Sequence, residues 1–233
     1  MKTKVDIGII GAMDTEVNNL ISALKNHKEE QVGSITFHLG ILEGKHVAVA
    51  RCGIGKVFAA MCAETMIIAY SPRLIINTGV GGGLSRGIGV CDVVVADRLV
   101  QHDMDTSALG DPKGLISGIN VIYFDTDRRA ADIACEACAA AGLRFHRGTV
   151  ASGDVFVCES EHKARIRDTF SADVCEMEGA AIAQAAYVNG TPFVVIRAIS
   201  DSADEGSSMD YMEFLPIAAK NSTEITRALC REF

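Results

Sequence analysis

Carboxylates at the edges of apolar segments are the residues of this sequence best suited to chemistry. Glu176 and Glu178 lie in the segment VCEMEGAAIA, and Asp201 directly follows the apolar run FVVIRAIS. Such a run is typical of a strand that is buried on both faces of a parallel sheet. Asp201 therefore falls at the carboxyl end of a predicted strand, where open α/β sheets bind their ligands. These acids predict acid–base chemistry at that edge.

Three glycine-bearing segments follow other predicted strands, and glycine allows the backbone to approach a ligand closely. We predict turns at GAM (11–13), CGIG (52–55) and TGVGGG (78–83). None fits a nucleotide-binding fingerprint, because Leu84 breaks a GxGxxG pattern and Lys56 lacks the upstream glycine of a P-loop. The turns predict a pocket for a small molecule, and they disfavour a dinucleotide-dependent oxidoreductase.

Apolar segments of strand type alternate with segments of helical periodicity, which predicts an α/β fold with a mostly parallel or mixed sheet flanked by helices. The predicted strands cover residues 5–10, 35–42, 46–51, 74–78, 90–100, 145–151 and 193–199. The predicted helices cover residues 15–26, 56–70, 127–141, 161–169, 179–189 and 210–230. The 233 residues, 1–233, are expected to form one domain.

Charge and composition restrict the partners. A net charge of -8, without a basic cluster longer than Arg128-Arg129, argues against nucleic acid. No apolar run reaches the roughly 20 residues that span a bilayer, and no signal peptide is evident, so we expect a cytoplasmic protein without membrane contact. The eight cysteines are expected to be free thiols. Neither the CxxC of Cys135 and Cys138 nor the HDMD of residues 102–105 has further ligands nearby, so no metal is expected.

Seven longer motifs follow one another along nearly the whole chain. They are IGIIGAMDTEV (7–17), RCGIGKV (51–57), LIINTGVGGGL (74–84), HDMDTSALG (102–110), GTVASGDVF (148–156), VCEMEGAAIA (174–183) and RAISDSAD (197–204). Together they resemble the bacterial 5'-methylthioadenosine/S-adenosylhomocysteine nucleosidases, within the nucleoside phosphorylase-I superfamily. The resemblance implies a three-layer α/β/α fold with a central mixed sheet, a homodimer and no cofactor. It implies hydrolysis of the N-glycosidic bond of these nucleosides, and of 5'-deoxyadenosine, in methionine salvage and the activated methyl cycle.

Release of adenine requires an acid that protonates N7, negative charge near the cationic sugar, and a base that activates water at C1'. By the resemblance, Asp201 is the acid, oriented by Ser200, and burial would have to favour its protonated form. Glu16 is similar to the base that activates water, with Arg197 placed to pair with it and keep it ionised. Glu178 is similar to the residue that binds the ribose hydroxyls and faces the oxocarbenium ion.

The resemblance also implies the walls of the pocket. Phe156 resembles the ring that stacks on adenine, and the backbone of Val157 resembles the group that reads its Watson–Crick edge. The other candidates are Met177, which assists Glu178 through its backbone; Glu176, whose role stays open; Met13, Ile54 and Tyr211 around the 5'-alkylthio group; and Thr106 and Leu109, which reach the pocket of the partner subunit.

Alternatives remain open. A purine nucleoside phosphorylase needs a phosphate cradle, but CGIGK supplies only Lys56 and amides, and Val80 stands where many relatives carry serine. A futalosine-type nucleosidase stays possible because the preferred substrate is not determined. Asp111-Pro112 and Ser117 differ from aromatic and proline residues in parts of the family, which leaves tolerance for the larger homocysteine tail open. A noncatalytic nucleoside-binding protein is disfavoured by four residues that occur together: Glu16, Glu178, Arg197 and Asp201.

Overall fold

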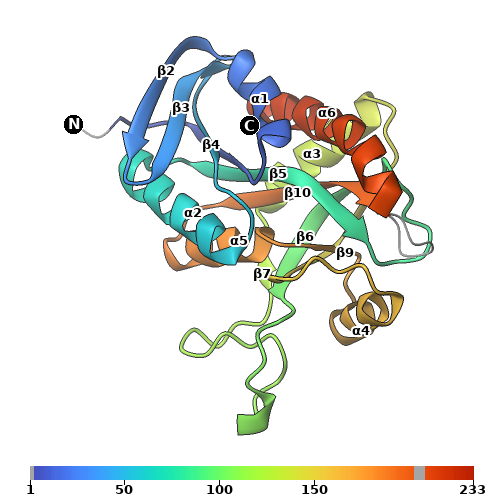
Figure 1. Cartoon of the computed structure of the whole chain (residues 1–233). Coiled ribbons are helices and arrows are strands. Elements are labelled where there is room, and N and C mark those ends of the chain that lie inside the picture. The colour runs from blue at the N-terminus through green and yellow to red at the C-terminus, as the bar shows by residue number, and fades with distance from the viewer. Residues whose placement is uncertain (1–2, 202–207) are drawn as a thin grey trace.

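The computed structural model describes residues 3–201 and 208–233, with the side chains of residues 208–213 outside the description. A mixed β-sheet lies at its centre, with helices on both sides, which confirms the predicted fold class (Figure 1). The strands are β1 (Ile7–Gly11), β2 (Lys25–Val32), β3 (Ile35–Leu42), β4 (Lys45–Arg51), β5 (Leu74–Gly83), β6 (Val93–Gln101), β7 (Phe124–Asp125), β8 (Phe145–Ser152), β9 (Val174–Glu176) and β10 (Phe193–Asp201). The helices are α1 (Asp14–Ser22), α2 (Lys56–Tyr70), α3 (Arg128–Ala140), α4 (Ser160–Phe170), α5 (Gly179–Val188) and α6 (Ser208–Glu232), with a 3-10 helix η1 (Ser107–Leu109).

Strand β5 is the junction of the sheet. It pairs in parallel with β1 and with β10, while its last two residues, Gly82 and Gly83, pair antiparallel with β9. Strand β10 continues to β6, β8 and β9, so these strands and β5 close into a ring. Strands β1, β4, β3 and β2 extend from β5 as an open sheet. Because β1, β5 and β10 are parallel, their carboxyl ends meet at one edge.

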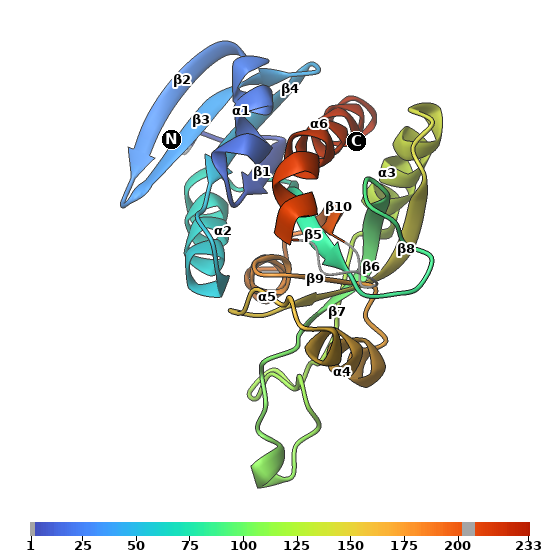
Figure 2. The same ribbon diagram turned by 45° about the vertical axis from the view of Figure 1, so that its right-hand side comes forward.

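Two apolar cores lie on opposite faces of the sheet (Figure 2). Helices α2 and α5 pack on the face that carries Ile75, whereas α1, α3 and α6 pack on the face that carries Ile76. Successive strand residues point to opposite faces, and both faces are covered, so the central strands are continuous apolar runs. A smaller core under α4 contains Ile166 and Phe170.

The helix predicted over residues 15–26 is wrong in its last four residues. Helix α1 ends at Ser22, and Lys25–Val32 forms strand β2, whose residues are exposed up to Val32. The sequence KNHKEEQV has no alternating apolar face, so periodicity cannot reveal this strand. Residues 25–32 form a strand because they pair antiparallel with β3.

The segment TGVGGG, predicted as a turn, is the last part of β5, so the strand predicted to end at residue 78 continues to Gly83. Tight packing explains the glycines: a β-carbon on Gly79 would lie 2.5 Å from Glu16 Oε1, and one on Gly81 would lie 2.6 Å from Val174 Cγ1. The prediction also lacks β7 and β9, because strands of two and three residues carry no periodic signal. The strand expected from residue 90 begins at Val93.

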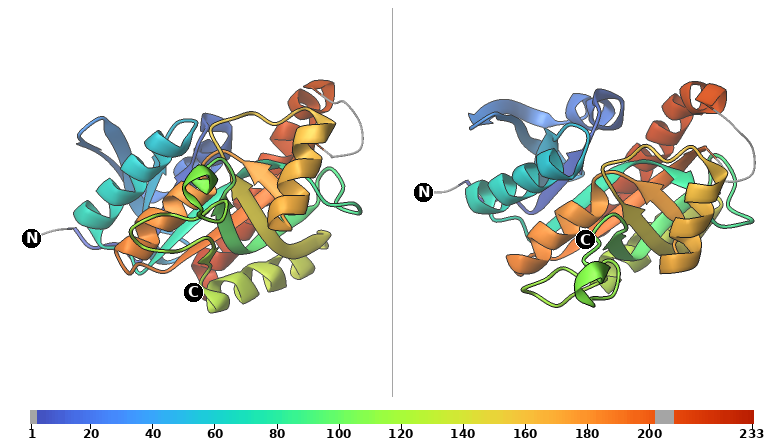
Figure 3. Two further views of the ribbon diagram at one scale, coloured as in Figure 1. Left: turned by 90° about the horizontal axis from the view of Figure 1, so that it is seen from below. Right: turned by 60° about the horizontal axis from the view of Figure 1, so that its bottom comes forward.

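Residues 102–123, between β6 and β7, leave the body of the protein. This segment is the green excursion at the bottom of Figure 1, and Figure 3 shows it from below. Its 3-10 helix η1 carries Leu109, which is 84% exposed. Across residues 3–201 and 208–233, none of the helices has the length and apolar character that crossing a membrane requires.

We expect Gly81→Ala to lower the free energy of unfolding by about 1–3 kcal/mol, because the added carbon overpacks the contact between β5 and β9. Gly89→Ala is the matched control, since a β-carbon there would meet only Asp92 Oδ2, at 3.9 Å. Urea unfolding of both variants, followed by circular dichroism, measures the difference. Equal stability of the two variants would contradict the tight packing of β9 on β5.

Candidate active site

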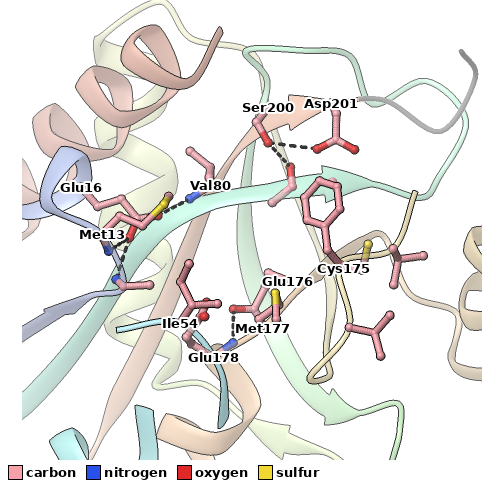
Figure 4. A pocket seen from close by; sticks show the side chains of 16 residues that line it. Met13, Glu16, Ile54, Val80, Cys175, Glu176, Met177, Glu178, Ser200 and Asp201 are labelled. Carbon is pink, nitrogen blue, oxygen red and sulfur yellow. Dashed lines mark hydrogen bonds between the residues drawn. The ribbon is translucent and has the colours of Figure 1, made fainter. Parts of the chain in front are cut away.

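A pocket of about 630 Å³ opens where the carboxyl ends of β1, β5 and β10 meet β9 (Figure 4). Its lining comes from separate stretches of the chain: Ala12, Met13, Glu16, Ile54, Val80, Gly81, Gly82, Val155, Phe156, Val157, Cys175, Glu176, Met177, Glu178, Ser200 and Asp201. Among the predicted site residues whose side chains are described, the structure thus brings together all apart from Arg197, Thr106 and Leu109.

Glu16 lies in the first turn of α1, and its carboxylate turns back to the amides that precede the helix. Oε2 accepts hydrogen bonds from the backbone nitrogens of Ala12 (2.6 Å) and Met13 (3.0 Å), and Oε1 accepts one from Val80 (3.1 Å). Burial raises the pKa of Glu16, while the charge of Arg197 and the three amides oppose the rise. A carboxylate with a raised pKa is a better proton acceptor near neutral pH than an exposed one.

The predicted ion pair between Arg197 and Glu16 is wrong, because Arg197 binds Glu176 instead. The two side chains are each 2% exposed, and Glu176 Oε2 lies 2.5 Å from Arg197 Nη2 and 3.2 Å from Nε. The guanidinium also donates to the side chain of Asn77 and to the carbonyl oxygen of Ile196. Arg197 therefore lies behind the wall of the pocket and acts on Glu16 through its charge.

Glu176, whose role the sequence leaves open, anchors the turn into α5. Oε2 accepts hydrogen bonds from the backbone nitrogens of Glu178 (3.0 Å) and Gly179 (2.7 Å), and Oε1 accepts the hydroxyl of Ser152. Unpaired amides at a helix N-terminus favour such a carboxylate. Burial alone would raise the pKa of Glu176, but the Arg197 guanidinium and the hydrogen bonds hold it below its usual range. Glu176 therefore stays ionised.

Glu178 immediately precedes α5 and has a different environment. It is 8% exposed, and its Oε1 accepts a hydrogen bond from the backbone nitrogen of Gly55 at 2.8 Å. Burial, and next the charge of Glu176, raise the pKa of Glu178 to about 7. Near neutral pH this side chain can therefore either accept or donate a hydrogen bond, which suits a group that binds hydroxyls.

Asp201 ends β10, and Figure 4 shows it across the pocket from Glu16. Its Oδ1 accepts a hydrogen bond from the hydroxyl of Ser200 at 3.0 Å, and its Oδ2 lies 3.1 Å from Lys163 Nζ. Sequence reasoning missed Lys163. A signal was available, because Lys163 has the i, i+3, i+7 spacing with Ile166 and Phe170 that defines one face of α4. That face is buried, so the lysine points inward.

Apolar side chains form the rest of the pocket. Met13, Ile54 and Met177 line it near the three glutamates (Figure 4). Phe156 and Val157 line it from the segment after β8. Phe156 is 58% exposed, whereas Val157 is 6% exposed. A ring exposed at the rim of a pocket can stack on a flat ligand, which would bury both.

Two of the predicted residues, Thr106 and Leu109, lie apart from this pocket. Thr106 and Leu109 belong to the excursion of residues 102–123, where the Thr106 hydroxyl donates to Asp111 Oδ2 at 2.8 Å. The backbone of Tyr211 belongs to α6, and its side chain lies outside the described residues.

Lys56, the cation of the CGIGK segment, is already engaged by acceptors. Its Nζ lies 2.6 Å from Asp103 Oδ1 and 3.0 Å from Gln101 Oε1. Asp103 Oδ2 also accepts the backbone nitrogen of Asp154 at 3.0 Å, and Asp154 Oδ1 accepts that of Lys56 at 2.7 Å. Through Asp103, the HDMD segment thus holds together the two loops beside the pocket that carry Lys56 and Asp154.

The fold and the pocket agree with the comparisons to known proteins. Residues 6–231 match the family described as the phosphorylase superfamily, to which the chain belongs. The 5'-methylthioadenosine/S-adenosylhomocysteine nucleosidase of Haemophilus influenzae (strain 86-028NP) is 40% identical over 220 residues, 94% of this chain and 95% of the relative. The crystal structure of the Neisseria meningitidis nucleosidase of the same name, in complex with methylthio-immucillin-A, is 37% identical, covers 100% of both chains and has a TM-score of 0.94. Within the superfamily, the chain belongs to the family of these nucleosidases.

Glu176→Gln is expected to lower the free energy of unfolding by about 3–5 kcal/mol, because it leaves the charge of Arg197 buried without a counter-ion. Glu178→Gln is the matched control: it keeps an acceptor for Gly55 and breaks no ion pair, so its effect should be about 1 kcal/mol or less. Urea unfolding at pH 7 measures both. Destabilisation of the same size in the two variants would contradict the anchoring role of Glu176.

Proposed function

We propose that this protein hydrolyses the N-glycosidic bond of 5'-methylthioadenosine and S-adenosylhomocysteine and releases adenine and the 5-thioribose sugar. One observation carries the proposal: a Glu16 carboxylate held by three amides faces, across one pocket, an Asp201 carboxyl held by Ser200. The names of the Haemophilus influenzae and Neisseria meningitidis relatives support the substrate class. The same reaction extends to 5'-deoxyadenosine, which lacks only the alkylthio group.

Asp201 acts as the acid in this proposal. The electron pair of the C1'–N9 bond passes to adenine as the bond breaks, and a proton on N7 makes adenine a better leaving group. An acid placed in this way typically contributes about 10²–10⁴-fold in rate. Ser200 supports the assignment, because its hydroxyl fixes one oxygen of the carboxyl group.

Glu16 removes a proton from the attacking water in this proposal. Its three amide hydrogen bonds fix the carboxylate, so it loses little freedom when water binds. Glu178, oriented by the Gly55 amide, binds the ribose hydroxyls beside Met177, and its negative charge stabilises the cationic sugar. Phe156 and Val157 hold the base, while the 5' group packs on Met13, Ile54 and Tyr211.

Hydrolysis is favoured over phosphorolysis by the charges around the pocket. The amides of Ala12, Met13 and Val80, which could hold an anion, already bind Glu16. A phosphate beside this carboxylate would meet a like charge in a buried site, which is costly. The cation of the CGIGK segment, Lys56, is neutralised by Asp103.

A futalosine-type nucleosidase is the second candidate. The futalosine hydrolase of Helicobacter pylori matches this structure with a TM-score of 0.93 and 34% identity, over 100% of this chain and 99% of that one. The two activities differ in the group attached at C5', so the wall near that group separates them. Met13 and Ile54 are apolar, which favours an alkylthio group, because thioethers and methionine pack well against apolar surfaces.

The proposal includes a homodimer and a cytoplasmic location. Exposed apolar side chains on α2 support a subunit interface: Val57, Phe58, Met61 and Ile68 are between 48% and 69% exposed. Large exposed apolar patches mark interaction sites. We place the excursion of residues 102–123, with Thr106 and Leu109, over the pocket of the partner subunit. Eight free cysteines support a reducing compartment.

We expect adenine release from 5'-methylthioadenosine in phosphate-free buffer, with a free sugar as the second product. Asp201→Asn should lower kcat by about a hundredfold or more, because the amide cannot donate the proton, while substrate still binds. An assay of the released purine base, with futalosine and 5'-deoxyadenosine as additional substrates, with and without phosphate, measures both. A requirement for phosphate with a sugar 1-phosphate product would overturn hydrolysis, and futalosine as the preferred substrate would favour the second candidate.

We expect Leu109→Asp to weaken both dimerisation and substrate affinity, because it places a charge in an apolar contact of at least about 1,000 Å². Ile217→Asp is the matched control, since Ile217 is 47% exposed on α6, across the sheet from α2. Sedimentation and KM measurements on both variants test the assignment. A Leu109→Asp variant with unchanged mass and KM would contradict it.

A further inference from the structure

A buried lysine contacts the carboxylate that we assign as the acid. Lys163 projects from α4, its side chain is 8% exposed, and its Nζ lies 3.1 Å from Oδ2 of Asp201. The side chain of Asp201 is 11% exposed. Since Ser200 binds the other carboxylate oxygen, both oxygens of Asp201 have a donor.

This contact gives Asp201 a neighbouring proton donor. Either charge would be costly to bury alone, so the ammonium and the carboxylate stabilise each other. As an ammonium, Lys163 is the donor of this contact and Oδ2 of Asp201 is the acceptor. The proton closest to Oδ2 is therefore on Lys163 Nζ.

Among the described residues, the other titratable groups facing this pair come from β9. Burial, and next the charge of Asp201, raise the pKa of the Cys175 thiol to about 12, so it stays neutral at working pH. Glu176 lies beyond it, and its carboxylate is committed to Arg197. Neither group competes with Lys163 as the proton source.

We propose that Lys163 supplies the proton that Asp201 delivers to adenine. As the C1'–N9 bond breaks, its electrons pass to the base and N7 takes a proton from Asp201. Asp201 takes one from Lys163, across a distance short enough for direct transfer. The lysine becomes a neutral amine and regains a proton from solvent, while Glu16 passes the proton of the attacking water to solvent.

Lys163 is therefore a positioning residue that acts through Asp201 without touching the base. The inference rests on the proposed hydrolysis and names the origin of its proton. It predicts that activity depends on the lysine most strongly at alkaline pH. Without the lysine, Asp201 must take its proton from solvent, where protons become scarcer as the pH rises.

The test measures kcat/KM for adenine release from pH 5.5 to 9. In Lys163→Met we expect kcat/KM to fall further below wild type as the pH rises, by at least about tenfold at pH 8.5, because only the proton source beside Asp201 is lost. The ratio of variant to wild-type kcat/KM removes the pH dependence that other groups, such as Glu16 and Glu178, contribute equally to both enzymes. Arg165→Met, an exposed change on α4, is the matched control and should follow wild type throughout.

The variant Lys163→Arg tests whether Lys163 acts by supplying a proton or only by its positive charge. Guanidinium keeps a positive charge beside Asp201 but does not release its proton in this pH range, so kcat/KM should stay about tenfold or more below wild type throughout. Restoration of the wild-type profile by arginine, or a deficit in Lys163→Met that is equal at all pH values, would overturn proton supply. If wild type itself releases no adenine, the proposed function fails first, and the two failures are distinct.

Discussion

The ion pair between Arg197 and Glu176 ties β10 to β9 inside the protein, and Asn77 of β5 binds the same guanidinium. Three strands that end at the pocket therefore share one buried cation. A charge in this position is stable only with its partners in place, so the pair fixes the ends of these strands relative to one another. Through its bonds to the first amides of α5, Glu176 also places Glu178.

Neighbouring carboxylates acquire different properties from this arrangement. Arg197 keeps Glu176 ionised, burial and the charge of Glu176 bring the pKa of Glu178 to about 7, and Glu16 balances burial against three amides. Environments that separate the proton affinities of nearby acids allow each one a different role. The glycines of β5 make the close approach possible: a β-carbon on Gly82 would lie 3.0 Å from Oδ2 of Asp201.

The sequence predicts the fold wherever burial leaves a periodic pattern. The central strands are apolar on both faces, and helices α2 to α5 begin and end within two residues of the predicted positions. Prediction fails where the pattern is absent or misleading. Strand β2 is exposed and charged, β9 has three residues, and the glycines of β5 serve side-chain packing rather than a turn. Contacts with other segments of the chain decide all three.

The motifs of the sequence determine by themselves which residue types the pocket contains. Their resemblance to a known family predicts that Glu16, Glu178 and Asp201 share one site. Sequence does not determine which charge meets which. The sequence prediction pairs Arg197 with Glu16, yet the guanidinium binds Glu176. Lys163 reaches Asp201 from α4, a helix that lies outside all seven motifs. The packing of separate elements decides which group pairs with a buried charge. A charge removed from water needs a partner close by, and only the tertiary structure brings that partner into contact.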